Sequence, residues 1–421
     1  MRMARVGSAL AGGGAIVALA LSACGGSSGS LATLAHTTTS RSSAGKARAS
    51  ARSSTRHTTP RPASKSSTIA RMLGQLIVGR FSGAAPPAAF LDQIRSGELG
   101  GVILFTENVA AGPTATRDLD EQLQRAATEG GNPPLLIMTD QEGGEVKRLA
   151  WAPPRMAAAE MPSGAVARAE GEATGRAMRA VGINVDLAPV ADTVHVARSF
   201  LHTRSFGSDP ASVAERACGF ANGIASQGVA YTLKHFPGLG RALTNTDVQP
   251  TTVDASASAL REDYLPYREC AGNADALVMV NSAIYPSLTG TKTPAVMSPE
   301  IYKTELPMAT SATPVTISDD LQAAALVKED RPAQRALTAG LDILLYAQSA
   351  EAALDAFVKL RVVAESGGIP SSRIEQAYQA VEGLKVRVAG AQPPATQGGS
   401  TASSPGEGAS YPGGPETIKP E

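Results

Sequence analysis

Eight short apolar runs, separated by stretches of helical character, constrain the fold of this 421-residue chain more than any other feature. The runs are residues 75–81, 102–105, 135–139, 185–190, 231–234, 276–280, 315–318 and 343–346. Most are continuously apolar rather than alternating, which is typical of parallel strands covered on both faces. The segments between them predict helices, among them residues 165–180, 210–227, 255–271 and 321–339. Eight strand–helix units in about 320 residues predict an α/β fold of the (β/α)8 barrel type.

An open, doubly wound sheet is the alternative arrangement of such units. Its nucleotide-binding form carries Gly-x-Gly-x-x-Gly after the first strand, and no such sequence follows residues 75–81. The glycine-containing turn around Gly240 comes too late in the chain and has the wrong spacing. The barrel is therefore the preferred prediction.

Both ends of the chain differ in composition from this central region. Residues 1–23 combine Arg2 and Arg5 with an apolar run that is too short for a comfortable membrane span, as in an export signal. Residues 24–70 are rich in Ser, Thr, Ala and Arg, and residues 390–421 in Pro, Gly and Ser. Neither segment has enough large apolar side chains to offset the entropy of ordering, so we expect both to be disordered around a folded body at residues 71–389.

The formal net charge of zero hides an uneven distribution of charge. Residues 72–390 hold 27 basic and 35 acidic residues, a formal charge of −8, whereas residues 25–71 hold eight basic residues and no acidic one. A body this acidic does not suggest a nucleic-acid partner. The basic segment is compatible with contact to anionic lipid or wall polymer, and equally with a soluble spacer.

The three cysteines allow several interpretations. Leu21-Ser-Ala-Cys24 resembles the lipobox of bacterial lipoproteins, in which the cysteine is lipidated and becomes the first residue. An ordinary secretory signal with a chance cysteine is the alternative. Cys218 and Cys270 then remain, either joined in a disulfide, which export would permit, or present as two separate buried thiols. No Cys or His spacing predicts a metal site.

Polar side chains gather where the apolar runs end, which is where a barrel carries its chemistry. Lys234 and His235 end the fifth run at a tight Pro-Gly turn, and Asp319 ends the seventh. The others are Asp140 and Glu142 after the third run, Asp192 after the fourth and Ser282 just past the sixth. One such residue would more often be a cap, but several on one rim predict a site, and donors facing carboxylates favour sugar chemistry.

Six short segments, most of which contain these strand-end residues, together resemble the single-barrel β-N-acetylglucosaminidases of glycoside hydrolase family 3. The resemblance covers roughly residues 70–388. The segments are residues 101–105, 139–144 with Arg148, 188–192, 204–210, 234–238 and 317–321. The resemblance implies a retaining hydrolase without metal or organic cofactor, acting on N-acetylglucosamine at the non-reducing end of N-acetylglucosaminyl-muramyl cell-wall fragments. We expect this hydrolase to be a monomer. A lipid on Cys24 would tether it to the outer face of the cell membrane.

The resemblance also implies roles for individual residues. Asp319 matches the catalytic nucleophile, and a retaining glycosidase needs such an ionised carboxylate beside the anomeric carbon. Asp320 is then a supporting or capping residue. The alternative for Asp319 is an N-cap of a helix that starts near Leu321. The positions that match sugar-binding residues are Asp140, Arg148, Arg204, Lys234 and His235. Their alternatives are a structural ion pair for either arginine and a core histidine for His235.

One loop departs from the family pattern. The family carries Asp-Ser-His or Asp-Thr-His after the Lys-His-x-Pro-Gly turn, with the histidine as general acid/base, and this chain has Asn245-Thr246-Asp247 instead. Because a carboxylic acid can transfer the same protons, we predict Asp247 as the acid/base, with Glu142 as the fallback. The departure keeps a second function open, a catalytically weak barrel that binds wall glycan. A third is a related enzyme of other specificity, such as a β-glucosidase, or a phosphorylase.

Overall fold

In the computed structural model, which describes residues 65–390, the eight apolar runs form eight strands of one parallel sheet. The strands are β1 (Ile77–Gly79), β2 (Gly101–Ile103), β3 (Leu136–Thr139), β6 (Val185–Asp186), β7 (Ala230–Phe236), β8 (Ala276–Val280), β9 (Val315–Ser318) and β10 (Leu344–Leu345). Every residue in these strands is buried, which explains why the runs are continuously apolar.

The sheet closes on itself. Its strand order is β10-β1-β2-β3-β6-β7-β8-β9, and each pair is parallel. An isolated parallel bridge between Ile317 and Ile343 joins the two ends of that order, with the Ser318 amide donating to the Ile343 carbonyl at 3.0 Å. The predicted (β/α)8 barrel is confirmed.

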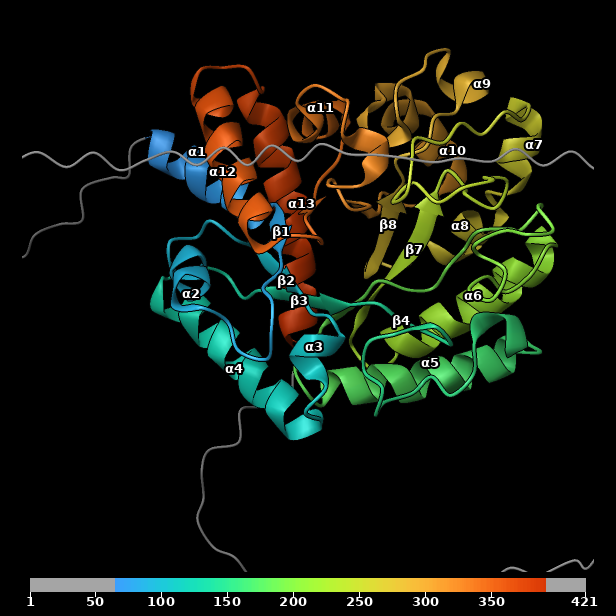
Figure 1. The fold of residues 1–421 in the computed structure, drawn as a ribbon, viewed down its shortest axis with the longest axis horizontal. Coiled ribbons are helices and arrows are strands. Elements are labelled where there is room, and N and C mark those ends of the chain that lie inside the picture. The colour runs from blue at the N-terminus through green and yellow to red at the C-terminus, as the bar shows by residue number, and fades with distance from the viewer. Residues whose placement is uncertain (1–64, 391–421) are drawn as a thin grey trace, which may run out of the picture. The chain divides into compact units, whose positions relative to one another are not determined.

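Helices surround the strands (Figure 1). The longer ones are α1 (Lys65–Gln75), α2 (Ala88–Arg95), α4 (Pro113–Glu129), α5 (Gly164–Arg179), α6 (Pro210–Ala225), α11 (Pro332–Ala339), α12 (Ala350–Glu365) and α13 (Ser371–Gly390). The shorter ones are α3 (Thr106–Val109), α7 (Ala257–Glu262), α8 (Leu265–Cys270), α9 (Pro286–Thr289), α10 (Leu306–Ala309), η1 (Ala158–Glu160), η2 (Ala295–Met297), η3 (Ile301–Glu305) and η4 (Ala324–Leu326). A small antiparallel hairpin, β4 (Gln141–Gly143) and β5 (Val146–Lys147), follows β3. Helix α1 packs against α12 and α13, so the two ends of the described region meet on one side of the barrel.

Two predicted helices and one predicted boundary are corrected. The helix expected over residues 255–271 is divided into α7 and α8, because Pro266 has no amide hydrogen and can be accommodated only in the first turn of a helix. Of the helix expected over residues 321–339, only α11 and the short η4 form, and α11 likewise starts with a proline. Helix α1 begins at Lys65, inside the segment expected to be disordered up to residue 70. The predicted export signal, Cys24, the rest of that segment and the C-terminal segment after residue 390 lie outside the described residues.

Cys218 in α6 and Cys270 in α8 form a disulfide, with their Cα atoms 5.0 Å apart. This decides between the two alternatives that the sequence leaves open. Disulfides of this kind persist in oxidising compartments. Within residues 65–390, no helix has the length and apolar character needed to cross a bilayer.

Candidate active site

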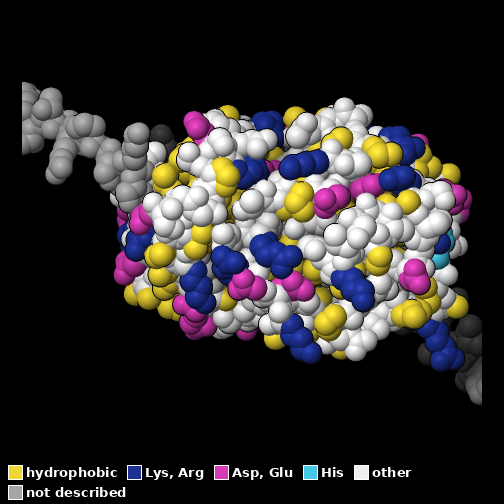
Figure 2. All heavy atoms as spheres, turned by 90° about the horizontal axis from the view of Figure 1, so that it is seen from above, with side chains coloured by type: hydrophobic (Ala, Val, Ile, Leu, Met, Phe, Trp, Pro, Cys, Tyr) yellow, Lys and Arg dark blue, Asp and Glu magenta, His cyan; other side chains and the backbone are white. Residues whose placement is uncertain are grey.

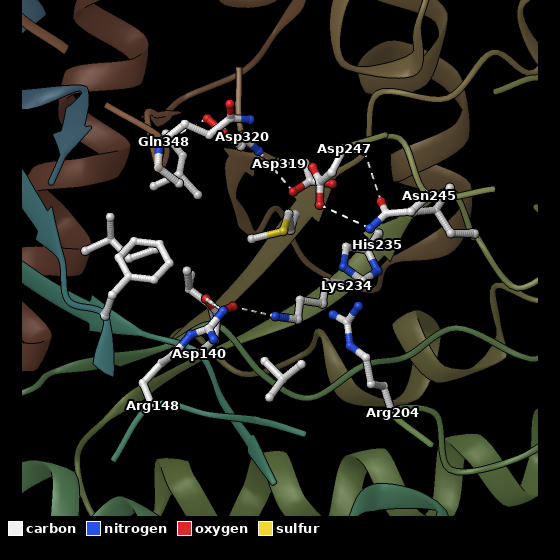
Figure 3. A pocket seen from close by; sticks show the side chains of 18 of the residues that line it. Asp140, Arg148, Arg204, Lys234, His235, Asn245, Asp247, Asp319, Asp320 and Gln348 are labelled. Atoms are coloured by element: carbon white, nitrogen blue, oxygen red, sulfur yellow. Dashed lines mark hydrogen bonds and ion pairs between the residues drawn. The ribbon is translucent and has the colours of Figure 1, made fainter. Parts of the chain in front are cut away.

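A pocket of about 350 Å³ opens at the carboxyl ends of the barrel strands (Figure 3). Its polar lining consists of Asp140, Arg148, Arg204, Lys234, His235, Asn245, Asp247, Asp319, Asp320 and Gln348. The structure thus brings together the seven residues that the sequence predicts to hold or process the sugar. They come from the loops after β3, β6, β7 and β9 or from the end of β7 itself, so the closure of the barrel assembles the site.

The turn after β7 is held close to the neighbouring loop. A Cβ atom on Gly240 would lie only 1.7 Å from the carbonyl oxygen of Thr193, so only glycine fits there. The His195 amide donates to the Gly240 carbonyl at 2.9 Å in the same contact. This close approach fixes the direction in which the chain leaves Lys234 and His235.

Lys234 is the centre of an ion-pair network on one wall of the pocket. Its ammonium donates to Asp140 Oδ1 at 2.8 Å, and its side chain is only 2% exposed. The guanidinium of Arg148 lies 3.8 Å from the other oxygen of Asp140 and 5.2 Å from the ring centre of Phe105. Asp140 is thereby held between two cations, with its carboxylate at the pocket surface.

Glu142 is buried behind this wall. Its carboxylate receives two hydrogen bonds of 2.8 Å from the guanidinium of Arg204 and lies 2.6 Å from the Lys234 ammonium. Burial alone would raise the pKa of Glu142, but Lys234 and Arg204 outweigh burial and lower that pKa to about 2. Glu142 does not line the pocket and would not hold a proton, so the fallback prediction of Glu142 as acid/base is wrong.

Asp192 orients His235. One Asp192 oxygen lies 2.7 Å from His235 Nδ1 and 3.0 Å from the His235 amide, and the other accepts from the Leu239 amide at 2.6 Å. This arrangement places the proton on Nδ1 and leaves Nε2 for a ligand. His235 is buried, as the core-histidine alternative supposed, but its ring bonds to the Asp192 side chain and also lines the pocket.

Asp319 follows the last residue of β9. Its amide donates to the Val280 carbonyl at 2.9 Å, and its Oδ1 accepts from the Asp320 amide at 2.9 Å. Burial raises the pKa of Asp319, His235 opposes that shift, and the charge on Asp247 adds to it, giving a value of about 6. No helix starts at Leu321, so the N-cap alternative for Asp319 is excluded.

Asp247 lies next to Asp319 on the loop after β7 (Figure 3). Asn245 Nδ2 donates to Asp247 Oδ2 at 3.2 Å, and the Asp247 amide donates back to Asn245 Oδ1 at 3.0 Å. Thr246, between them, is fully buried, and its carbonyl accepts from the Ala325 amide at 3.0 Å. The loop is therefore attached to the segment that follows Asp319, with Asn245 and Asp247 turned into the pocket.

Three further polar residues require comment. Asp320 Oδ1 accepts from the amides of Gln322 and Ala347, as a supporting or capping residue would. Gln348 is exposed at the pocket surface after β10 and was not predicted from the sequence. Only its position just after the eighth strand could have indicated that it lines the pocket. Ser282 is buried and does not line the pocket, so its expected place on the rim is wrong.

Residues 65–390 contain no cluster of His, Cys, Asp and Glu that could hold a metal ion.

The family comparison supports the resemblance noted from the sequence. The Glycosyl hydrolase family 3 N terminal domain matches residues 68–384. An uncharacterized secreted glycosyl hydrolase from Arthroderma benhamiae is 32% identical over 333 residues, which cover 76% of this chain and 94% of that protein. The β-hexosaminidase LpqI from Mycobacterium tuberculosis is 29% identical over 328 residues, which cover 74% of this chain and 81% of LpqI.

Solved structures agree with these relatives. A glycoside hydrolase family 3 β-N-acetylglucosaminidase from Paenibacillus sp. superposes with a TM-score of 0.72 at 29% identity, covering 78% of this chain. The matched region spans 64% of the Paenibacillus chain, less than two thirds of its length. The predicted family and barrel are thereby confirmed.

Proposed function

Because this chain belongs to glycoside hydrolase family 3, we propose that it is a retaining exo-β-N-acetylglucosaminidase that removes N-acetylglucosamine from the non-reducing end of cell-wall fragments. The observation that carries the proposal is the division of the pocket into two walls. Asp319 and Asp247 lie together on one wall, and the network of Asp140, Lys234 and Arg204 forms the other.

In the first step, ionised Asp319 attacks the anomeric carbon while Asp247 gives its proton to the glycosidic oxygen. The bond from C1 to the leaving oxygen breaks, the leaving sugar departs as an alcohol, and a glycosyl ester forms on Asp319. In the second step, Asp247 takes a proton from water, whose oxygen displaces Asp319 from C1 with net retention of configuration.

The opposite wall supplies the contacts that hold the sugar. Asp140 accepts from sugar hydroxyls, while Arg148, Arg204 and Lys234 donate to hydroxyl or acetamido oxygens. His235 presents Nε2 and is kept in place by Asp192. Side chains fixed by such networks lose little freedom when a ligand binds, which favours tight recognition of one sugar ring.

We place the enzyme outside the cytoplasm, tethered through a lipid on Cys24. The disulfide between Cys218 and Cys270 supports an oxidising compartment. Metabolic labelling with a fatty-acid analogue, compared between the wild-type chain and Cys24→Ser, tests the anchor. Equal labelling of both chains would contradict it.

Turnover of p-nitrophenyl β-N-acetylglucosaminide and of the corresponding glucoside tests the activity. Release from the first substrate alone supports the proposal, and release from the glucoside alone would indicate the other sugar specificity. In phosphate buffer, mass spectrometry separates free N-acetylglucosamine from its 1-phosphate, which identifies a phosphorylase. Release from neither substrate, together with measurable binding of N-acetylglucosamine, would favour the glycan-binding barrel that the Asn245-Thr-Asp247 loop leaves open.

The nucleophile has its own test. Asp319→Ala is expected to lower kcat by roughly 10⁴-fold, because the covalent intermediate cannot form. Circular dichroism should show the fold of the wild-type chain. Retained turnover in a folded variant would remove Asp319 from the mechanism.

A further inference from the structure

Glu142 contacts two sugar-facing cations without facing the sugar itself. It comes from β4, directly behind the pocket wall, and its side chain is 2% exposed. Both of its oxygens bond to Arg204, and one of them also bonds to Lys234. The contacts join three separate parts of the chain: the hairpin after β3, the loop before α6 and the end of β7.

The charges on this wall are nearly balanced because of Glu142. The wall carries three cations, Arg148, Arg204 and Lys234. Asp140 contacts two of these cations, and Glu142 contacts two. Among the groups in direct contact, two carboxylates against three cations leave one positive charge in excess, and loss of Glu142 would leave two.

An unpaired cation at this position would attract an anion. Lys234 is 2% exposed, so water cannot solvate its ammonium well if a carboxylate is removed. Desolvated Lys and Arg form their strongest hydrogen bonds with phosphate, sulfate and carboxylate oxygens. With both carboxylates in place, these cations keep only their remaining N–H groups for a ligand, and a neutral hydroxyl or acetamido oxygen satisfies those.

Selection against anions has no other evident source on the face of the molecule shown in Figure 2. Basic and acidic side chains are interspersed there rather than gathered into a field of one sign. Although residues 72–390 carry a formal charge of −8, side chains of both signs interspersed in this way gather no field of one sign on this face. We therefore look for a source of such selection inside the pocket.

We infer that Glu142 is a positioning residue that sets specificity: it commits Arg204 and Lys234 to a neutral sugar and keeps small inorganic anions out of the pocket. The inference rests on the proposed function for the identity of the sugar. It assigns no contact between Glu142 and the substrate.

Glu142→Gln tests this inference, because it removes the charge and keeps the shape. Calorimetric titration with inorganic phosphate and with sulfate, at constant ionic strength in chloride, should show binding at least about tenfold tighter than in the wild-type enzyme. The KM for p-nitrophenyl β-N-acetylglucosaminide should rise about tenfold while kcat stays within about threefold, since the lost contact acts on binding. Phosphate should inhibit the variant competitively.

Glu145→Gln is the matched control. Glu145 is exposed on the same hairpin and bonds to Thr203, beside Arg204, but contacts neither cation. The Glu145→Gln substitution removes the same charge from the same hairpin. Because Glu145 contacts neither Arg204 nor Lys234, the substitution should leave both KM and phosphate affinity unchanged. Phosphate affinity in Glu142→Gln that stays within twofold of the wild-type value would overturn the inference, and so would equal tightening in the control.

A second variant and the wild-type enzyme keep the inference testable if Glu142→Gln does not fold. Glu142→Asp keeps the charge but is too short to reach both cations, so KM should rise while phosphate affinity stays at the wild-type value. Tighter phosphate binding in that variant, or micromolar phosphate binding by the wild-type enzyme, would contradict the inference. If the wild-type chain hydrolyses no glycoside, the proposed function fails, but the phosphate titrations still decide the present inference because they need no turnover.

Discussion

Asp319 and Asp247 face the same pocket from different loops, and the charge on Asp247 disfavours ionisation of Asp319. Burial is the larger cause, and together they bring the pKa of Asp319 to about 6 in spite of the opposing effect of His235. In the proposed mechanism the first of these carboxyls has to be ionised and the second protonated. Repulsion between the two carboxylates favours states in which the pair carries at least one proton.

The first prediction concerns the acidic limb of the pH profile. Because Asp319 must be ionised to attack, kcat/KM should fall about tenfold per pH unit below a pH of about 6, the value to which its pKa is raised. Asp247→Asn removes the neighbouring negative charge, which lowers the pKa of Asp319 and should move the limb to lower pH. Profiles of both enzymes with an aryl glycoside give the measurement, and a limb that does not move would show that Asp247 does not act on Asp319.

The second prediction concerns proton donation. Asp247→Ala should slow hydrolysis of a disaccharide by at least about 10²-fold more than hydrolysis of a dinitrophenyl glycoside, because the aryl leaving group needs almost no protonation. Comparison of kcat/KM for the two substrates in both enzymes measures the difference. Azide should partly restore the aryl reaction by replacing water as acceptor. Equal losses on both substrates would count against Asp247 as the acid.

The third prediction concerns the bridge between α6 and α8. The Cys218→Ser, Cys270→Ser double variant should lose about 4 kcal/mol of unfolding free energy, the value that chain entropy gives for a loop of this length, since the two cysteines are 52 residues apart. Urea denaturation measures this loss. Activity at 25 °C should persist, because neither cysteine lines the pocket.

Reductant provides the control for that measurement. It should lower the stability of the wild-type chain by a similar amount and leave the double variant unchanged. A wild-type chain that is insensitive to reductant under denaturing conditions would contradict the bridge.

Strand positions and strand-end residues were predictable because both follow from local pattern. A continuous apolar run such as residues 276–280 coincides with β8. Lys234 and Asp319 were predicted as site residues because they are the polar residues at which two such runs stop. Helices were less predictable where proline intervenes, as in the division of α7 from α8 at Pro266.

Partners in three dimensions could not be predicted from these patterns. Asp140 and Glu142 are only two positions apart in the sequence. The closed barrel shows that Asp140 faces the pocket, whereas Glu142 is buried behind it against Arg204. The bridge between Cys218 and Cys270 likewise depends on α6 packing against α8. Gln348 carries no motif and reaches the pocket only because the eighth loop closes the ring.

The last prediction concerns the departure from the family pattern. Asn245→Asp combined with Asp247→His should give an active enzyme, because an aspartate two residues before a histidine can orient and charge the ring as it does in the family. The alkaline limb of kcat/KM should then follow an imidazole, with a midpoint near pH 6.5 or about one unit above. Profiles with the p-nitrophenyl substrate measure that limb.

The single variants test the coupling between the two positions. Asp247→His alone leaves the ring beside an amide, which cannot stabilise its charged form, so it should be less active than the double variant. Asn245→Asp alone puts a second carboxylate beside Asp247, which disfavours loss of the Asp247 proton and should extend activity to higher pH. Asn245→Ala, which removes both hydrogen bonds between Asn245 and Asp247, of 3.2 Å and 3.0 Å, should lower kcat without that extension. If the two single substitutions change the activation free energy by amounts that simply add up in the double variant, residues 245 and 247 do not act as a unit.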